Sequence, residues 1–564
     1  MKKHITRLLF AALLLLALCI GASAAGTSGK CGPSAYWSFD SSTGTLTISG
    51  SGAMNDYEYG DYPWMDYRDS IQTIVIGDQI TQIGRYAFTG TACSTIKFGK
   101  NVRSIGERAF LECRNLNGDL TLPDSVQTIG AGAFQGCEKL SGDLTIPDSV
   151  VEIGEGAFRD CKNLNGTLTL GKNLRTIGKE AFSGCAFTGS LTIPEGVTEI
   201  ADSAFGAGIP LKKYGMFTGT LTLPSTLKTI GASAFSYADF SGELLIPDGV
   251  TSIGANAFEE CDGFGGTLSL PDSVKTVGEW AFYLCKGFTG LKLSAGLTKI
   301  EKLSFAHMYG LKTEVVIPEG VTEIGESAFQ CSHMPSVRFP STLKKIGKEA
   351  FYFSLNCKIA FPDGLEVIED EAFALCNVKS AVILPASIKS IGKKAFDSDW
   401  SYGKHNDIPL GAYFLGAAPQ LVGTGNANCS FPSDWTLNYL PGTSGWMGDT
   451  YEGYKIVPWD GETRWDNLYT DDFGYRDNKR NEIEASWSVN TDTGKVTLTD
   501  DLNEGCVVAV SYDAEGRVTS IGVLRTKTDS VRLNLQDTCR LFLLNASSAP
   551  RLNTPVTIND YLPT

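Results

Sequence analysis

The chain has 564 residues, of which 42% are hydrophobic and 20% charged, and this length exceeds what one hydrophobic core usually organises. Its 62 glycines are well above the usual share of about 7%, which indicates a fold with many tight turns. The formal net charge of −15, with no Lys/Arg cluster in the sequence, excludes nucleic acid as a partner, because phosphate binding needs a basic stripe.

The first 24 residues are typical of a secretion signal. Lys2, Lys3 and Arg7 form a basic start, and residues 8–20 form an apolar stretch too short to span a bilayer comfortably. The small residues Ala-Ser-Ala at 22–24 suit a cleavage site, although a retained membrane anchor is the alternative. We therefore predict a signal peptide at residues 1–24 and a secreted or cell-surface protein with no membrane span after signal removal.

A repeat covers most of the remaining chain. An Ala-Phe dipeptide recurs at intervals that are nearly all 22 to 24 residues, Ser304-Phe305 fills the one gap, and an insertion follows Phe205. The repeat phenylalanines are Phe88, Phe110, Phe134, Phe158, Phe182, Phe205, Phe235, Phe258, Phe282, Phe305, Phe329, Phe351, Phe373 and Phe396. Such regular self-similarity predicts a stacked repeat architecture.

One unit shows how a single coil is built. Leu120 and Leu122 flank Thr121, which is the period of two expected for a short strand with one buried face. Pro123 ends that strand because proline cannot donate to a ladder, and Gly130 permits a sharp corner. No single unit can bury its apolar face alone, so the units must stack into a solenoid with one continuous core.

This pattern resembles the BspA-like leucine-rich repeat family, whose units carry a strand, a proline, an Ile-Gly corner and an Ala-Phe pair. The resemblance covers residues 71–396 and implies a β-rich leucine-rich-repeat solenoid of about fourteen coils. Residues 25–70 also match the family, with Cys31-Gly32, Trp37 and Pro63-Trp64, and we predict that they form the N-terminal cap that an open solenoid end requires.

The repeat pattern ends after Phe396, and three further segments are predicted. Residues 397–465 are rich in aromatic side chains and resemble the closing segment of such arrays. Residues 466–484 are polar and indicate a linker. Residues 485–564 contain alternating apolar runs, which predict a small C-terminal β-sandwich that resembles an accessory module of exported proteins.

Seven of the fifteen cysteines share one position in the repeat, three residues after the phenylalanine. They are Cys113, Cys137, Cys161, Cys185, Cys261, Cys285 and Cys376. A fixed position favours buried thiols along the core, where cysteine behaves as a small hydrophobe. Disulfides between adjacent coils stay open as the alternative, because the spacing of stacked coils, about 4.8 Å, does not forbid them.

No motif for catalysis, a cofactor or a metal is found in the sequence. His307, His333 and His405 belong to no ligand or catalytic pattern and are expected to be structural. Asp397 and Asp399 begin like a calcium loop, but Ile408 stands where the bidentate glutamate belongs. The acidic residues that follow the repeat prolines indicate turns. We therefore predict that the protein is not an enzyme.

A binding surface is the remaining prediction. The middle residue of each first strand points away from the core, and stacking aligns these residues along a sheet roughly 65 Å long. The candidate row comprises Thr121, Thr145, Thr169, Thr192, Thr222, Leu245, Ser269, Lys292, Val316 and Arg338. Threonine is favourable at any exposed strand position. The alternative explanation of the row is therefore β-strand propensity without a binding role.

The family resemblance implies adhesion to proteins of a host matrix or of neighbouring cells. Glycan binding through the aromatic segment from Trp400 to Tyr475, or a passive spacer role in the cell envelope, are the alternatives. For the same aromatic segment, a hydrophobic seal over the last coil is the competing explanation.

Overall fold

The structure is a computed structural model. It describes residues 27–206, 216–354, 359–376, 382–397, 411–422, 430–432 and 435–458, and seven strands after residue 486. The predicted signal peptide and linker lie outside the described residues. The chain forms two compact units: Met1–Leu227 with Ala234–Phe240, and Lys228–Ser233 with Ser241–Thr564.

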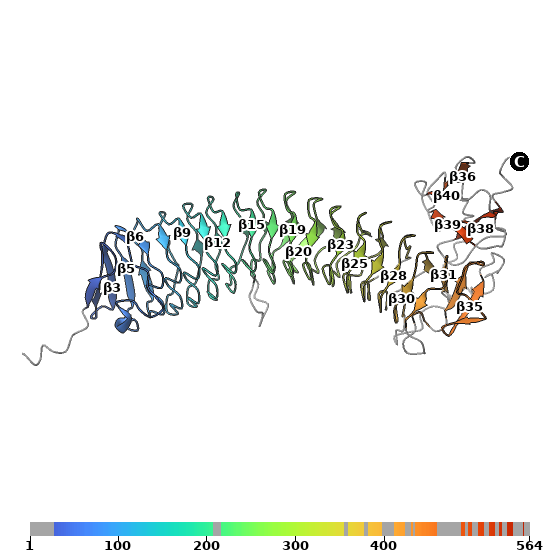
Figure 1. The fold of residues 1–564 in the computed structure, drawn as a ribbon. Helices are drawn as coiled ribbons and strands as arrows, with labels where there is room; N and C mark the ends of the chain where they lie inside the picture. Colours follow the sequence, from blue (N-terminus) through green and yellow to red (C-terminus); the bar gives the residue numbers. More distant parts are fainter. Residues whose placement is uncertain are drawn as a thin grey trace, which may run out of the picture. The chain divides into compact units, whose positions relative to one another are not determined.

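Unit 1 is a parallel β-solenoid whose coils lie one beside the next (Figure 1). Each coil contributes up to two short strands, one on each side of the proline turn. The first strands are β5 (Thr73–Ile76), β7 (Thr95–Lys97), β10 (Leu144–Thr145), β12 (Leu168–Thr169), β14 (Leu191–Thr192) and β16 (Leu221–Thr222). The second strands are β6 (Ile80–Ile83), β8 (Ser104–Ile105), β9 (Thr128–Ile129), β11 (Glu152–Ile153), β13 (Thr176–Ile177) and β15 (Glu199–Ile200).

Residues ahead of the first coil close the N-terminal end of unit 1. They form β1 (Ser28–Lys30), β2 (Ala35–Asp40), β3 (Thr45–Gly50), β4 (Gly52–Ala53) and a 3₁₀ turn, η1 (Met65–Tyr67). The first three strands are antiparallel, β3 then pairs in parallel with β5, and β4 with β6. Trp64 is fully buried and stacks on Phe88 at 5.4 Å between ring centroids. The first repeat phenylalanine is therefore covered by an aromatic ring.

The repeat phenylalanines form a continuous column inside unit 1. From Phe88 to Phe235, successive rings are 5.1 to 5.6 Å apart and inclined by 2° to 17°. All of them are fully buried, which confirms the burial predicted from their fixed position in the repeat. Near-parallel aromatic pairs of this kind contribute about 0.5–1.5 kcal/mol each beyond the area they bury.

Close contact between coils explains the small residues of the repeat. The backbone N–H of most repeat phenylalanines donates to the carbonyl of the residue before the phenylalanine in the next coil, as from Phe110 to Ala133 at 2.8 Å. At the Ile-Gly corner, a Cβ on Gly130 would lie 2.6 Å from the backbone nitrogen of Glu107 in the previous coil. Glycine is needed there because two backbones approach each other closely.

Two residues in most coils adopt left-handed backbone angles, two positions before and two positions after the phenylalanine. Around Phe88 these are Tyr86, with φ 55°, and Gly90, with φ 66°. Around Phe282 they are Trp280 and Leu284, both with φ 60°. The pair of turns brings the Ala-Phe segment back against the core.

Unit 2 repeats this architecture and ends in a longer parallel sheet. The first strands are β18 (Gly242–Leu245), β20 (Phe264–Ser269), β22 (Gly290–Lys292), β24 (Val315–Val316), β26 (Val337–Arg338), β29 (Val382–Leu384), β31 (Gly411–Phe414), β33 (Thr436–Tyr439) and β35 (Tyr454–Pro458). The second strands are β17 (Thr229–Ile230), β19 (Ser252–Ile253), β21 (Thr276–Val277), β23 (Lys299–Ile300), β25 (Glu323–Ile324), β27 (Lys345–Ile346), β28 (Val367–Ile368), β30 (Ser390–Ile391) and β32 (Gln420–Leu421).

The solenoid of unit 2 continues beyond Phe396, where the Ala-Phe period of the sequence stops. Phe431 stacks on Phe396 at 5.2 Å with an inclination of 3°, and the Phe396 N–H donates to the Ser430 carbonyl at 3.0 Å. Ser430-Phe431 thus occupies the place of an Ala-Phe pair. Strands β31, β33 and β35 extend the parallel sheet from β29. The predicted closing segment, residues 397–465, therefore contains a further coil around Phe431.

Aromatic side chains close the last coils of unit 2. Trp435 stacks against Phe431 at 5.5 Å, and Trp446 contacts Phe414 at 4.9 Å. All four are buried, and the antiparallel strand β34 (Thr450–Tyr451) completes the edge of the sheet against β35. These described rings form a hydrophobic seal, as the second explanation of this segment predicts. Trp400, Trp459, Trp465 and Tyr475 lie outside the described residues.

The C-terminal residues form two antiparallel sheets. Their strands are β36 (Trp487–Asn490), β37 (Lys495–Leu498), β38 (Cys506–Tyr512), β39 (Val518–Leu524), β40 (Ser530–Arg532), β41 (Thr538–Leu544) and β42 (Val556–Thr557). The orders are β36-β37-β40 and β39-β38-β41-β42. The strands predicted here are present, and their packing into a β-sandwich stays a prediction.

Candidate binding surface

Every residue of the candidate row is exposed, while its neighbours in the strand are buried. Thr145 follows the buried Leu144, and Thr192 lies between the buried Leu191 and Ile193. The row also exposes apolar side chains, above all Leu245, with 72% of its surface accessible. The alternation predicted from the sequence therefore places these side chains on the outside of the coils.

The row does not lie on one continuous sheet, which corrects the expectation of a single sheet along all coils. In unit 1 it lies on the two-stranded sheets β10-β12 and β14-β16, and Thr121 lies outside any strand. In unit 2 it lies on β18-β20-β22 and β24-β26. Most of these strands are only two residues long because the proline turn follows at once, so each coil offers few ladder hydrogen bonds.

The longer ladders run through the second strands, which the sequence pattern did not predict. Strands β4, β6, β8, β9, β11 and β13 form one six-stranded sheet, and β23, β25, β27, β28, β30 and β32 form another. Some outward residues of this face are engaged with neighbouring side chains. Thr128 donates to the Ser104 hydroxyl at 2.9 Å, and Lys345 pairs with Glu369 at 2.7 Å. Others, such as Glu152 and Thr176, are exposed.

The cysteine position carries a hydrogen-bond ladder that packing alone does not explain. The Cys137 thiol donates to the Phe110 carbonyl at 3.2 Å, and the Cys161 thiol donates to the Phe134 carbonyl at 3.1 Å. Where a coil has serine at this position, as at Ser332, the hydroxyl makes the same bond, to the Phe305 carbonyl at 2.7 Å. The predicted burial of these thiols is confirmed, and burial raises their pKa values.

Acidic residues after the repeat prolines form ion pairs and hydrogen bonds with residues of the next coil. The Asp148 carboxylate accepts the Lys172 ammonium at 2.7 Å and the Lys172 N–H at 3.0 Å, and the lysine lowers the pKa of Asp148. The Glu195 carboxylate accepts the backbone N–H and hydroxyl of Ser225, which lower the pKa of Glu195. These groups belong to turns, as predicted.

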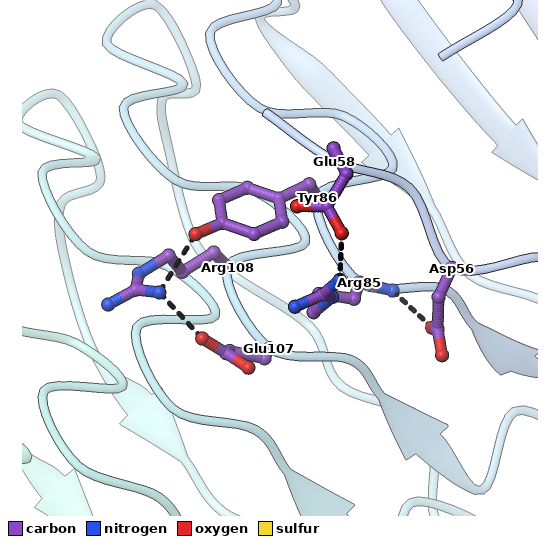
Figure 2. Close-up of polar contacts among 6 residues, drawn as sticks. All are labelled: Asp56, Glu58, Arg85, Tyr86, Glu107 and Arg108. Atoms are coloured by element: carbon purple, nitrogen blue, oxygen red, sulfur yellow. Dashed lines mark hydrogen bonds and ion pairs between the residues drawn. The ribbon is translucent and has the colours of Figure 1, made fainter. Parts of the chain in front are cut away.

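A polar cluster ties the N-terminal segment to the first two coils (Figure 2). Arg85 pairs with Glu58 at 2.5 Å, and the Asp56 carboxylate accepts the Arg85 N–H at 2.8 Å. Arg108 donates to the Tyr86 hydroxyl at 2.8 Å, and both guanidinium groups lie less than 6 Å from the Tyr86 ring. The charged and polar groups of this cluster pair with one another, so the cluster stabilises the N-terminal end of the solenoid.

The other candidate groups do not assemble into a site. His307 and His333 lie among aromatic rings on the outside of unit 2, and His405 lies outside the described residues. Asp397 pairs with Lys394 at 3.2 Å, while Asp399 and Ile408 are not described. Among the described residues, no group of three or more His, Cys, Asp or Glu side chains could hold a metal ion.

The repeat architecture agrees with a match to a known family. A model described as the BspA type leucine rich repeat region, with six copies, matches residues 62–142, 117–219, 141–264, 213–330 and 288–402. These stretches together span 62–402, more than half of the chain. The chain belongs to the BspA-type leucine-rich repeat family. This confirms the resemblance and the solenoid fold, and it makes the chain a repeat scaffold.

Solved structures with similar folds are also bacterial leucine-rich repeat proteins. One from Eubacterium ventriosum is 22% identical, with 68% of this chain and 98% of that chain covered and a TM-score of 0.39. One from Bacteroides ovatus is also 22% identical, with coverages of 67% and 93% and a TM-score of 0.44. A leucine rich cell surface protein from Faecalibacterium prausnitzii is 28% identical, with coverages of 57% and 90% and a TM-score of 0.36.

At these TM-scores the similarities carry no argument about function. No curated protein matches the chain significantly. Within the part of the chain that the structure describes, no helix is long and apolar enough to cross a membrane.

Proposed function

We propose that the protein is an exported cell-surface binding protein and not an enzyme. Its solenoid would engage proteins of a host matrix or of neighbouring cells through the candidate row. The observation that carries the proposal is the exposure of all ten row residues over coils whose inward residues are buried. Family membership supports a repeat scaffold, and the N-terminal signal-like sequence supports export.

The row has groups that a protein partner can use. The hydroxyls of Thr145, Thr169 and Thr192 make no hydrogen bond to another described residue, so they are available to a ligand. Leu245 and Val316 add exposed apolar surface on other coils. Individual contacts of this kind are weak, but repetition raises the effective concentration of each next contact.

The proposal predicts that binding is spread along the row. Replacing Thr145, Thr169 and Thr192 together by Glu adds three like charges to an acidic protein and leaves the buried strand positions intact. We expect the variant to fold and to lose at least about tenfold in affinity for a captured matrix protein, because each desolvated charge opposes the contact. Surface plasmon resonance against a panel of immobilised matrix proteins measures this.

A matched variant separates the row from general charge effects. Gln127, Thr176 and Thr198 are also exposed residues of unit 1, but they lie outside the row. Replacing these three by Glu adds the same charge, and this variant should bind like the wild type. Equal affinity of the two triple variants, with both folded by circular dichroism, would remove the row from the proposed function.

A further inference from the structure

An aromatic ribbon lies on the outside of unit 2, on residues that do not belong to the candidate row. Its rings come from four consecutive coils and contact one another in an unbroken series. In order they are Trp280, Tyr283, His307, Tyr309, His333 and Phe353, with successive centroids 4.5, 5.2, 5.5, 5.4 and 5.2 Å apart. Tyr309 and His333 are exposed and the other four are partly exposed.

The ribbon differs from the other coils in that its rings come from adjacent coils. Two residues before or after the phenylalanine, coils of unit 1 carry rings at Tyr86 and Tyr237, which belong to coils that are not adjacent, whereas unit 2 carries Trp280, His307 and Phe353 at these positions. The core does not require these rings, because the repeat phenylalanines beneath them stack as in other coils, at 5.3 to 5.7 Å.

Four ribbon residues are also held in backbone conformations that disfavour large side chains. Trp280, His307, His333 and Phe353 have φ values of 60°, 60°, 50° and 53°. Bulky residues are rare in the left-handed region and cost free energy there. Most other coils also place side chains other than glycine in this region, so the backbone angles of Trp280, His307 and Phe353 follow from the coil itself.

The chemistry of the ribbon favours an uncharged ligand with both apolar faces and hydroxyl groups. Five of the six rings carry a nitrogen or a hydroxyl at their edge, and the Tyr309 hydroxyl lies 2.5 Å from Nδ1 of His307. Burial lowers the pKa of His307, helped by Lys286 and His333, and so disfavours the charged imidazolium. Lys286 itself is paired with Asp262 at 3.0 Å.

We propose that the aromatic ribbon is a binding platform for an uncharged glycan chain. The C–H faces of pyranose rings would lie on the aromatic faces, and sugar hydroxyls would bond to the Tyr and His edge atoms. Contacts repeated over four coils suit an extended polymer better than a single sugar. This inference does not rest on the function proposed for the row, which lies on different residues.

The test is affinity electrophoresis of the chain without residues 1–24. Native gels contain a soluble β-glucan, a galactomannan, a xyloglucan or, as the anionic comparison, heparin. We expect at least one uncharged polysaccharide to retard the wild type, equally at about 0.1 M and about 1 M salt, because screening affects only charged contacts. The double variant Tyr309→Ala/His333→Ala should bind at least about fivefold more weakly.

Two variants make the result specific. Tyr36→Ala removes an exposed ring of unit 1, with 49% of its surface accessible, and should bind like the wild type. Tyr309→Phe keeps the ring face and should retain more binding than Tyr309→Ala. The proposal is overturned if none of the uncharged polysaccharides retards the wild type, or if a folded double variant binds unchanged. It is also overturned if the double variant loses only heparin or matrix-protein binding.

Discussion

Left-handed backbone angles recur at fixed places in the coil, and side chains other than glycine occupy many of them. This regularity follows from the two turns that flank the Ala-Phe segment. The sequence does not reveal it, because Tyr, Arg, Glu, Ser and Trp all appear two positions before the phenylalanine. The angles are imposed by the stacked coils and not by local preference.

Gly90 offers a clean measurement of this backbone effect. It has φ 66° and open space where a Cβ would be added, so Gly90→Ala should destabilise by about 1–2 kcal/mol through the backbone alone. Gly265 also has open space around its Cβ position but no positive φ. Gly265→Ala should therefore be neutral or stabilising by up to about 1 kcal/mol. Urea unfolding of both variants checks this, and equal losses would contradict it.

The cysteine ladder yields a second prediction at the residue scale. Cys161→Ala removes the thiol that donates to the Phe134 carbonyl, but this carbonyl keeps the Cys137 N–H at 3.2 Å. We expect a loss of about 1–2 kcal/mol from the missing bond and the small cavity. Cys161→Ser should cost less, because Ser332 makes the same bond in its own coil. If denaturant melts show Cys161→Ser to be less stable than Cys161→Ala, packing alone selects cysteine at this position.

At the scale of the coil, the sequence predicts the core well and the ladders poorly. Leucine alternation and the Ala-Phe period identify buried positions correctly, as for Leu144 and Phe158. The second strands are only two residues long in most coils, so they carry no alternating pattern to detect. Their pairing depends on stacking, which one unit cannot show.

Irregular spacing hides the coil at Phe431. It follows Phe396 by 35 residues and has Ser430 in place of alanine, so the period and the dipeptide fail together. The sequence of one unit does not predict the aromatic ribbon either, because its rings come from four coils and only stacking brings them into contact.

The phenylalanine column leads to a prediction for whole coils. Phe158→Ala in the middle of unit 1 should cost about 3–5 kcal/mol, as for other buried aromatic side chains. Phe88→Ala in the first coil should cost about as much, because Trp64 covers that ring and it is also fully buried. Unfolding free energies of the two variants test this. A much smaller loss at Phe88 would mean that the N-terminal residues do not seal the coil.

At the scale of the molecule, stacked coils separate stability from recognition. Inward residues repeat because every coil must fit its neighbours, while outward residues vary without loss of the core. The sequence therefore predicts the scaffold and its family, but it does not identify the ligand. Threonine is favourable at an exposed strand position such as Thr145 whether or not a partner contacts it.

Hydrogen–deuterium exchange tests the proposed role of the row most directly. The chain without residues 1–24 is compared alone and with a matrix protein that it captures. We predict slower exchange in the segments around Thr145, Thr169 and Thr192, and no change in the segments around Gln127 and Thr176. Protection confined to the second strands or to the C-terminal sheets, with the row unaffected, would contradict the proposed function.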